Sequence, residues 1–139
     1  MNKILALDVG DKRIGLAVSD ELGIAAHPVC TINRRPGYKA DIETIRDIIG
    51  LCGATCVVVG IPINADGSEG SQAAACRRFA AKLAEKLDIP VEIWDEALST
   101  LEAEEILINA DKSRSKRKKI VDQLAAVLIL ESYLSAKHT

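Results

Sequence analysis

Aromatic side chains are scarce in this sequence, which has one Trp, two Tyr and one Phe among its 139 residues. A packed core must therefore be built from aliphatic side chains, mainly Ala, Val, Ile and Leu. Apolar residues make up 48% of the chain, which is enough for such a core. The length suits one domain, and we expect that domain to span residues 1–139.

Cysteine motifs that bind metal are also missing, and so are long apolar runs. The four cysteines form no C-x-x-C pair, and no paired His or Cys follows Cys52 and Cys56 at zinc spacing, so we expect reduced thiols. No window approaches the roughly 20 apolar residues that a bilayer-spanning helix needs. The opening MNKILALDVG has too short an apolar stretch to predict a signal peptide. We therefore expect a cytoplasmic protein.

Net charge is small, at −2, but the charges are unevenly distributed. Residues 111–119 (DKSRSKRKK) carry +5, whereas the rest of the chain carries −7. A basic segment on an otherwise acidic chain is either a solvated loop or a surface that binds phosphate. The composition alone leaves both interpretations open.

The spacing of apolar residues predicts the order of secondary structure. The first strand has apolar residues on both faces, which is typical of a central strand covered on both sides. Pro28 favours an edge position for the third strand. The order βββαβαβαα predicts an α/β domain with a mixed sheet and helices on both faces. Strands are predicted at Lys3–Val9, Arg13–Ser19, Ile24–Ile32, Thr55–Gly60 and Val91–Trp94, helices at Asp41–Cys52, Ser71–Leu87, Ser99 to about Ala110 and Ile120–Ala136, and a loop at Ile61–Gly70.

Acidic residues lie at the ends of two predicted strands. Asp8 is near the end of an apolar strand, where a carboxylate is costly unless it is paired or bound to metal. A turn aspartate that caps the hairpin is the alternative. Asp95 and Glu96 follow the strand at Val91–Trp94, and only one of them can face Asp8, because neighbours on an extended chain point to opposite sides. First-turn acids of the next helix are the alternative here.

Asp122 lies near the start of the last predicted helix, where stabilisation by the helix dipole is again the alternative. If the sheet brings the three elements together, their carboxylates form an oxygen-rich site suited to Mg²⁺ or Mn²⁺. Such a site can activate water against a phosphodiester. Because aromatics are few, we expect recognition of the nucleic-acid backbone shape. The residues predicted to contact phosphate are Lys12, Arg13, Arg114, Lys116, Arg117, Lys118 and Lys119.

Four blocks of the sequence resemble the YqgF family, which comprises bacterial RNase H-like proteins described as Holliday junction resolvases and as pre-16S rRNA nucleases. The blocks span nearly the whole chain in the family's order. They are Asp8-Val9-Gly10-Asp11-Lys12-Arg13-Ile14-Gly15 with Ala17-Val18-Ser19-Asp20, Gly60-Ile61-Pro62 with Asn64, Asp66-Gly67 and Ser68-Glu69-Gly70, Asp95-Glu96 with Leu98-Ser99-Thr100 and Glu102-Ala103, and Val121-Asp122 with Ala125-Ala126 and Leu128-Ile129-Leu130.

This resemblance implies an RNase H-like fold, with a mixed five-stranded sheet in the order 3-2-1-4-5 and strand 2 antiparallel. It also implies a catalytic, metal-binding triad of Asp8, Glu96 and Asp122, with Asp95 in reserve, and Mg²⁺ or Mn²⁺ as the cofactor. One position departs from the family. Ala97 stands where the family usually has Arg, which removes a phosphate contact or a salt bridge beside the site.

The expected function is that of a metal-dependent nuclease acting on precursor rRNA, in maturation of the 5′ end of small-subunit rRNA. Cleavage of Holliday junctions in branched DNA is the close alternative. Paired cuts usually need a symmetric dimer, but the sequence has no clear dimer surface, so we expect a monomer or weak homodimer without membrane contact. A non-catalytic nucleic-acid- or protein-binding domain is a further alternative. A nucleotide-binding module of the actin and sugar-kinase type would need two such domains.

Overall fold

The computed structural model describes residues 3–64, 66–96 and 114–137. Its five strands form one sheet in the order β3-β2-β1-β4-β5. β2 runs antiparallel to both of its neighbours, whereas β1, β4 and β5 are parallel to one another. The predicted strand order, the antiparallel second strand and the edge position of the strand with Pro28 are confirmed. The strands are β1 (Lys3–Val9), β2 (Arg13–Ser19), β3 (Ala26–Asn33), β4 (Ala54–Pro62) and β5 (Val91–Glu96).

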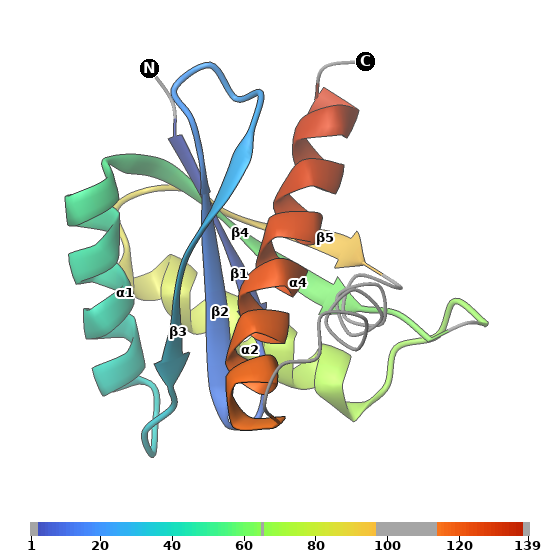
Figure 1. Ribbon diagram of the computed structural model, residues 1–139. Helices are drawn as coiled ribbons and strands as arrows, with labels where there is room; N and C mark the ends of the chain where they lie inside the picture. Colours follow the sequence, from blue (N-terminus) through green and yellow to red (C-terminus); the bar gives the residue numbers. More distant parts are fainter. Residues whose placement is uncertain (1–2, 65, 97–113, 138–139) are drawn as a thin grey trace.

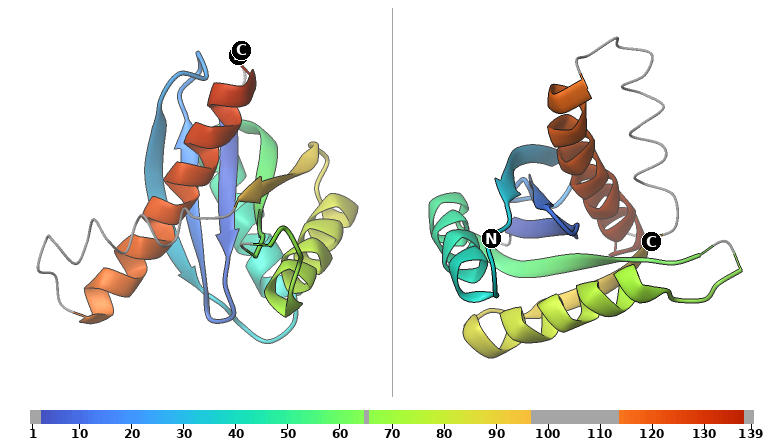
Figure 2. Two further views of the ribbon diagram at one scale, coloured as in Figure 1. Left: turned by 90° about the vertical axis from the view of Figure 1, so that its right-hand side faces the viewer. Right: turned by 90° about the horizontal axis from the view of Figure 1, so that it is seen from below.

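Helices cover both faces of this sheet (Figures 1 and 2). α1 (Lys39–Cys52) and α2 (Ser71–Lys86) lie on one face, and α4 (Arg114–Lys137) lies on the other. The side chains of β1 divide accordingly. Leu5 and Leu7 belong to the core under α1 and α2, whereas Ala6 packs with residues of α4. None of the described helices is long and apolar enough to cross a bilayer.

The predicted start of the last helix was wrong. α4 begins at Arg114 rather than at Ile120, so residues 114–119 of the basic segment are helical. The physical reason is that Lys and Arg are favourable helix formers, and a run of charge does not by itself end a helix. The helix predicted from Ser99 to about Ala110 lies outside the described residues.

The ends of β3, β4 and β5 differ from the predicted ones by one or two residues. β4 and β5 pair with each other as far as Pro62 and Glu96, which lengthens both. β3 begins later than predicted because Asp20 forms a turn, in which its carboxylate accepts hydrogen bonds from the backbone N–H groups of Ile24 and Ala25 at 2.9 and 3.2 Å. The bond from Ile24 is the largest cause that holds the pKa of Asp20 below its usual value.

Asp41 is a buried carboxylate that ties the start of α1 to the turn after β1. Its side chain is 1% exposed, and its Oδ2 lies 3.3 Å from the Nε of Arg34. Its Oδ1 accepts a hydrogen bond from the backbone N–H of Arg35 at 3.1 Å. Arg34 in turn donates to the backbone carbonyl of Gly10 at 3.0 Å. This ion pair therefore braces the chain immediately after the strand that contains Asp8.

We expect Asp41→Ala to lower the free energy of unfolding by about 3 kcal/mol, because it leaves a largely buried guanidinium without its carboxylate. Urea denaturation measures this loss. Asp47→Ala on the exposed side of α1 is the matched control and should change the stability by less than about 0.5 kcal/mol. Equal effects of the two substitutions would contradict the bracing role of Asp41.

Candidate functional site

Two glycines in the sheet allow α4 to approach it closely. A Cβ built on Gly15 of β2 would lie 1.9 Å from the backbone carbonyl oxygen of Asp122. A Cβ on Gly60 of β4 would lie 2.4 Å from the Cδ1 of Ile129. Real Cβ atoms essentially never lie closer than 3.0 Å to such atoms. At Gly15 the obstacle is backbone, so α4 keeps this position only while residue 15 is glycine, whereas at Gly60 the end of the Ile129 side chain could shift.

Asp8 and Asp122 both lie beside Gly15. Asp8 lies directly opposite Gly15 in the antiparallel pair of β1 and β2, and residues opposite each other point to the same face. That face is the one covered by α4, because Ala6, two residues earlier on β1, packs against α4. Asp8 is half-buried, and the side chain of Asp122 is 19% exposed. The first and last predicted acids thus lie near one another, although 114 positions in the numbering separate them.

Arg13 holds the carboxylate of Asp122. Its Nε lies 2.7 Å from the Oδ2 of Asp122, and the two side chains are 26% and 19% exposed. Arg13 and Gly15 are two positions apart on β2, so both face α4. The strand therefore directs the guanidinium of Arg13 toward Asp122. The sequence predicted that Arg13 would contact phosphate, whereas here it pairs with the predicted catalytic acid.

Two residues of α2 hold the backbone beside Asp8 in place. The carbonyl of Val9 accepts a hydrogen bond from the Nε2 of Gln72 at 2.8 Å and a second one from the thiol of Cys76 at 3.3 Å. Burial, and next the negative charge of Asp8, raise the pKa of Cys76 to about 11, so this thiol remains protonated and donates. Sequence reasoning missed both residues, because nothing in their local pattern connects them to β1.

β5 ends at the same edge of the sheet as β1 and β4, since the three strands are parallel. Trp94 points to the α4 face, where its Nε1 donates to the Oγ of Ser132 at 3.0 Å. Asp95 therefore belongs to the opposite face. In agreement, the pKa of Arg77 on α2 is raised first by its hydrogen bond to Glu69 and further by the negative charge of Asp95.

Glu96, the third predicted acid, ends β5 opposite Pro62, and its side chain lies outside the described part of the structure. Among the described residues, no group of three or more His, Cys, Asp or Glu side chains is placed to hold a metal ion. Asp8 and Asp122 belong to these described residues, whereas the side chain of Glu96 does not. The pair of acids at Gly15 is thus the described portion of the predicted triad.

Apart from Arg13, the predicted phosphate-binding residues fall into two groups. Lys12 is exposed in the turn between β1 and β2, beside the acids. The others lie in the first turns of α4, before Asp122, and their side chains are outside the described part. These are Arg114, Lys116, Arg117, Lys118 and Lys119.

Comparison with known proteins identifies relatives over nearly the whole chain. The family model described as "RuvX: Holliday junction resolvase" matches residues 2–136. A protein of Carboxydothermus hydrogenoformans named "Putative pre-16S rRNA nuclease" is 50% identical over 135 residues, which cover 97% of each chain. A protein of the same name from Geobacillus kaustophilus is 48% identical over 138 residues, which cover 97% of this chain and 99% of that one.

Two solved structures share the fold. T. thermophilus RuvC in complex with a Holliday junction has a TM-score of 0.55 at 16% identity, over 99% of this chain and 96% of that one. Fowlpox virus resolvase with Holliday junction DNA has a TM-score of 0.55 at 11% identity, over 99% of both. These likenesses confirm the predicted RNase H-like fold. With the family match and the close relatives, they show that this chain belongs to the RuvX family, which its motifs resemble under the name YqgF.

Proposed function

We propose that this chain is a metal-dependent nuclease that hydrolyses phosphodiester bonds in the 5′-end maturation of pre-16S rRNA. The observation that supports the proposal is that Asp8 and Asp122 both lie beside Gly15, where the parallel strands end. Ligands of α/β sheets bind at such carboxyl ends. RNA is the favoured substrate because relatives at 50% and 48% identity are named for cleavage of pre-16S rRNA.

Asp8, Glu96 and Asp122 are the proposed metal ligands. Mg²⁺ is usually held by one or two carboxylates together with phosphate oxygens of the substrate, so the carboxylates at Gly15 fit Mg²⁺ or Mn²⁺. Glu96 is preferred to Asp95 because Asp95 belongs to the α2 face. A divalent ion held by these residues would polarise the phosphate and lower the pKa of a bound water.

The contribution of the chain itself is to hold these acids in place. The ion pair with Arg13 fixes the Oδ2 of Asp122, and this carboxylate would help to hold the cation. Arg13 is thus a positioning residue for Asp122. Lys12 and the basic start of α4 are the proposed phosphate contacts, which add affinity that is independent of sequence and depends on salt.

Cleavage of Holliday junctions is the second candidate function. It is favoured by the description of the family model and by a fold shared with two proteins solved with Holliday junctions. That reaction needs two coordinated cuts, and hence two copies of the site related by symmetry. The candidates therefore differ in substrate and in oligomeric state.

The test is cleavage of a 5′-extended pre-16S rRNA fragment and of a four-way DNA junction, each with Mg²⁺ and with EDTA. We expect the RNA to be cut in Mg²⁺, not in EDTA, and again after Mn²⁺ is added in excess of the chelator. Linear duplex DNA of the same length is the control substrate. Cleavage of the junction alone would instead favour the second candidate, and cleavage of RNA in EDTA would contradict metal dependence.

A further inference from the structure

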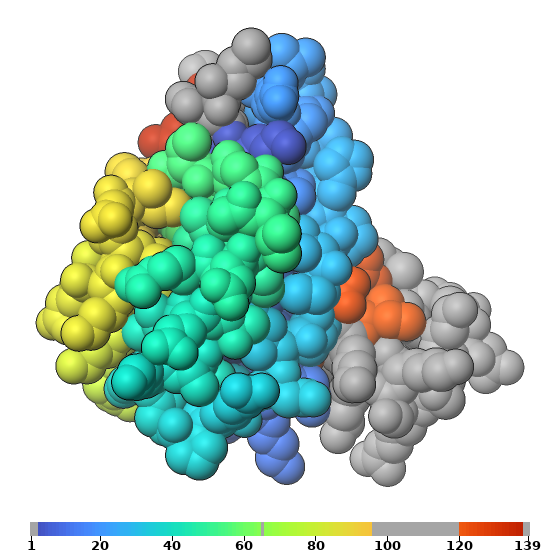
Figure 3. Space-filling view, turned by 90° about the vertical axis from the view of Figure 1, so that its left-hand side faces the viewer, coloured from blue at the N-terminus to red at the C-terminus, as the bar shows by residue number. Residues whose placement is uncertain are grey.

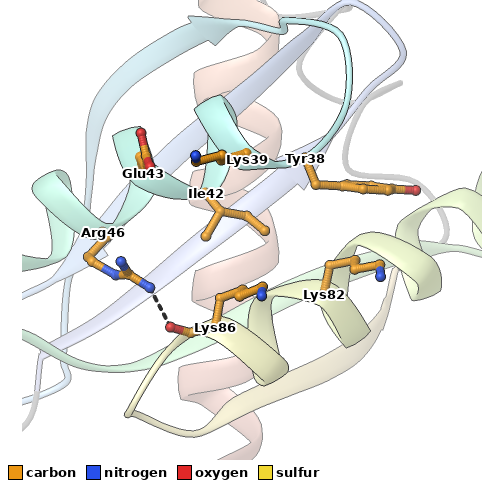
Figure 4. Close-up of a pocket in the computed structure, with 7 residues that line it drawn as sticks. All are labelled: Tyr38, Lys39, Ile42, Glu43, Arg46, Lys82 and Lys86. Atoms are coloured by element: carbon orange, nitrogen blue, oxygen red, sulfur yellow. Dashed lines mark hydrogen bonds between the residues drawn. The ribbon is translucent and has the colours of Figure 1, made fainter.

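A basic groove lies on the face of the sheet opposite the acids. It is a cavity of about 350 Å³ between the first half of α1 and the end of α2. Figure 3 shows these two helices side by side on one surface of the molecule, and Figure 4 shows the side chains that line the groove. Its cationic lining residues are Lys39 and Arg46 of α1 and Lys82 and Lys86 of α2.

The charge of this α1–α2 groove is unusual for the molecule. Its four cations face a single lining carboxylate, Glu43, although the chain as a whole has a net charge of −2. Within the described residues, Lys39 and Lys86 have no ion-pair partner. The ammonium of Lys82 lies 3.8 Å from Glu85, and its side chain is 49% exposed. Most of this positive charge is thus available to an anionic ligand.

The groove also has an apolar floor. Ile42 is 4% exposed and points between the helices in Figure 4. The ring of Tyr38 packs against Phe79, with centroids 5.9 Å apart and planes at 57°, and it remains half-buried. A flat aromatic surface beside several cations is the combination that binds a base and its phosphate. The volume lies at the small end of the range for small-ligand pockets, which suits one nucleotide.

The groove continues toward the acidic edge of the sheet. Tyr38 also lines a second depression of about 490 Å³, together with Asp11 of the β1–β2 turn and Arg35. On α2, Arg78 precedes Lys82 by one helical turn and is exposed. Because the two depressions share Tyr38, a molecule bound in the groove can extend toward the turn that follows Asp8. Such a path suits a polymer with repeated phosphates better than an isolated nucleotide.

We propose that the α1–α2 groove binds a nucleotide of a single-stranded segment of the substrate, outside the site of cleavage. The base lies on Tyr38 and Ile42, and phosphates contact Lys39, Lys82 and Lys86. This proposal rests on the proposed nuclease function, and it adds that the substrate carries an unpaired segment. Its test is binding in EDTA, which does not require cleavage.

The probe is a fluorescent, short single-stranded oligoadenylate, followed by anisotropy over a range of salt concentrations. The double variant Lys82→Gln/Lys86→Gln should weaken binding about tenfold at low salt. It should also flatten the slope of log K against log salt by about 1.4, since each phosphate contact on a single strand contributes about 0.7. Tyr38→Leu, which keeps an apolar side chain against Phe79, should weaken binding about fivefold through lost stacking.

The matched control is Lys3→Gln/Lys137→Gln, which removes the same charge at residues that do not line the groove and should bind like the wild type. Equal binding by the groove variant and the wild type would overturn the proposal. If free AMP bound as tightly as the oligoadenylate, the assignment of the groove to a nucleic-acid strand would be overturned. If the groove binds as expected but no RNA is cut in Mg²⁺, the proposed nuclease function fails while the groove assignment stands.

Discussion

Asp8→Asn is expected to slow RNA cleavage in Mg²⁺ by at least about a thousandfold, or roughly 4 kcal/mol of transition-state stabilisation. The substitution keeps the shape of the side chain and removes the negative charge that faces α4 at Gly15. A neutral amide cannot replace a carboxylate as a ligand for a hard divalent ion. Single-turnover cleavage measures the loss, and calorimetry should show weaker Mg²⁺ binding.

Asp95→Asn is the matched control for this substitution. It removes the same charge from the same edge of the sheet, but from a residue on the α2 face. We expect cleavage within about threefold of the wild type, because surface changes away from a site have small effects. If Asp95→Asn abolished cleavage and Glu96→Gln did not, the third ligand would be Asp95. Full activity of Asp8→Asn would remove the catalytic assignment altogether.

Gly15→Ala is expected to disrupt both the fold and the site. The new Cβ would lie 1.9 Å from the carbonyl oxygen of Asp122 and 2.3 Å from the carbonyl carbon, and backbone atoms cannot turn aside as a flexible side chain can. α4 must therefore move away from β2. We expect a loss of at least about 3 kcal/mol in the free energy of unfolding, measured by denaturation in urea.

The same substitution should reduce cleavage by about a hundredfold at a temperature where the variant is folded, because a shift of about 1 Å in a catalytic group has effects of this size. Gly50→Ala is the control. Gly50 lies in α1 with nothing within 4 Å of the position of a Cβ, so alanine there should stabilise the protein by about 0.5–1 kcal/mol. A Gly15→Ala protein with normal stability and activity would contradict the close approach of α4.

The strands of the fold could largely be predicted from local pattern. β1 and β2 have the predicted bounds, Lys3–Val9 and Arg13–Ser19. A strand covered on both faces needs apolar residues at successive positions, and such a run is visible in the local sequence. The start of α4 could not be predicted in this way, because the same lysines and arginines are compatible with a solvated loop and with a helix.

The site was only partly predictable for a related reason. Alternation showed that just one of Asp95 and Glu96 can share a face with Asp8, but not which one, since that depends on the position of Trp94 against α4. The pair formed by Arg13 and Asp122 spans 109 positions, and no local pattern reports such a contact. The sequence therefore identified candidate acids. Their shared position beside Gly15, and the ion pair of Asp122 with Arg13, depend on the packing of α4 and are known only from the structure.

The docking of α4 on β2 also has a consequence for any partly unfolded form of the chain. Asp8 lies in the sheet, whereas Asp122 is held in place only while its helix lies on Gly15. A form in which α4 has left the sheet keeps the strand that carries Asp8 but has lost Asp122 from its side. Undocking of this one helix would therefore separate the two acids of the proposed cation site.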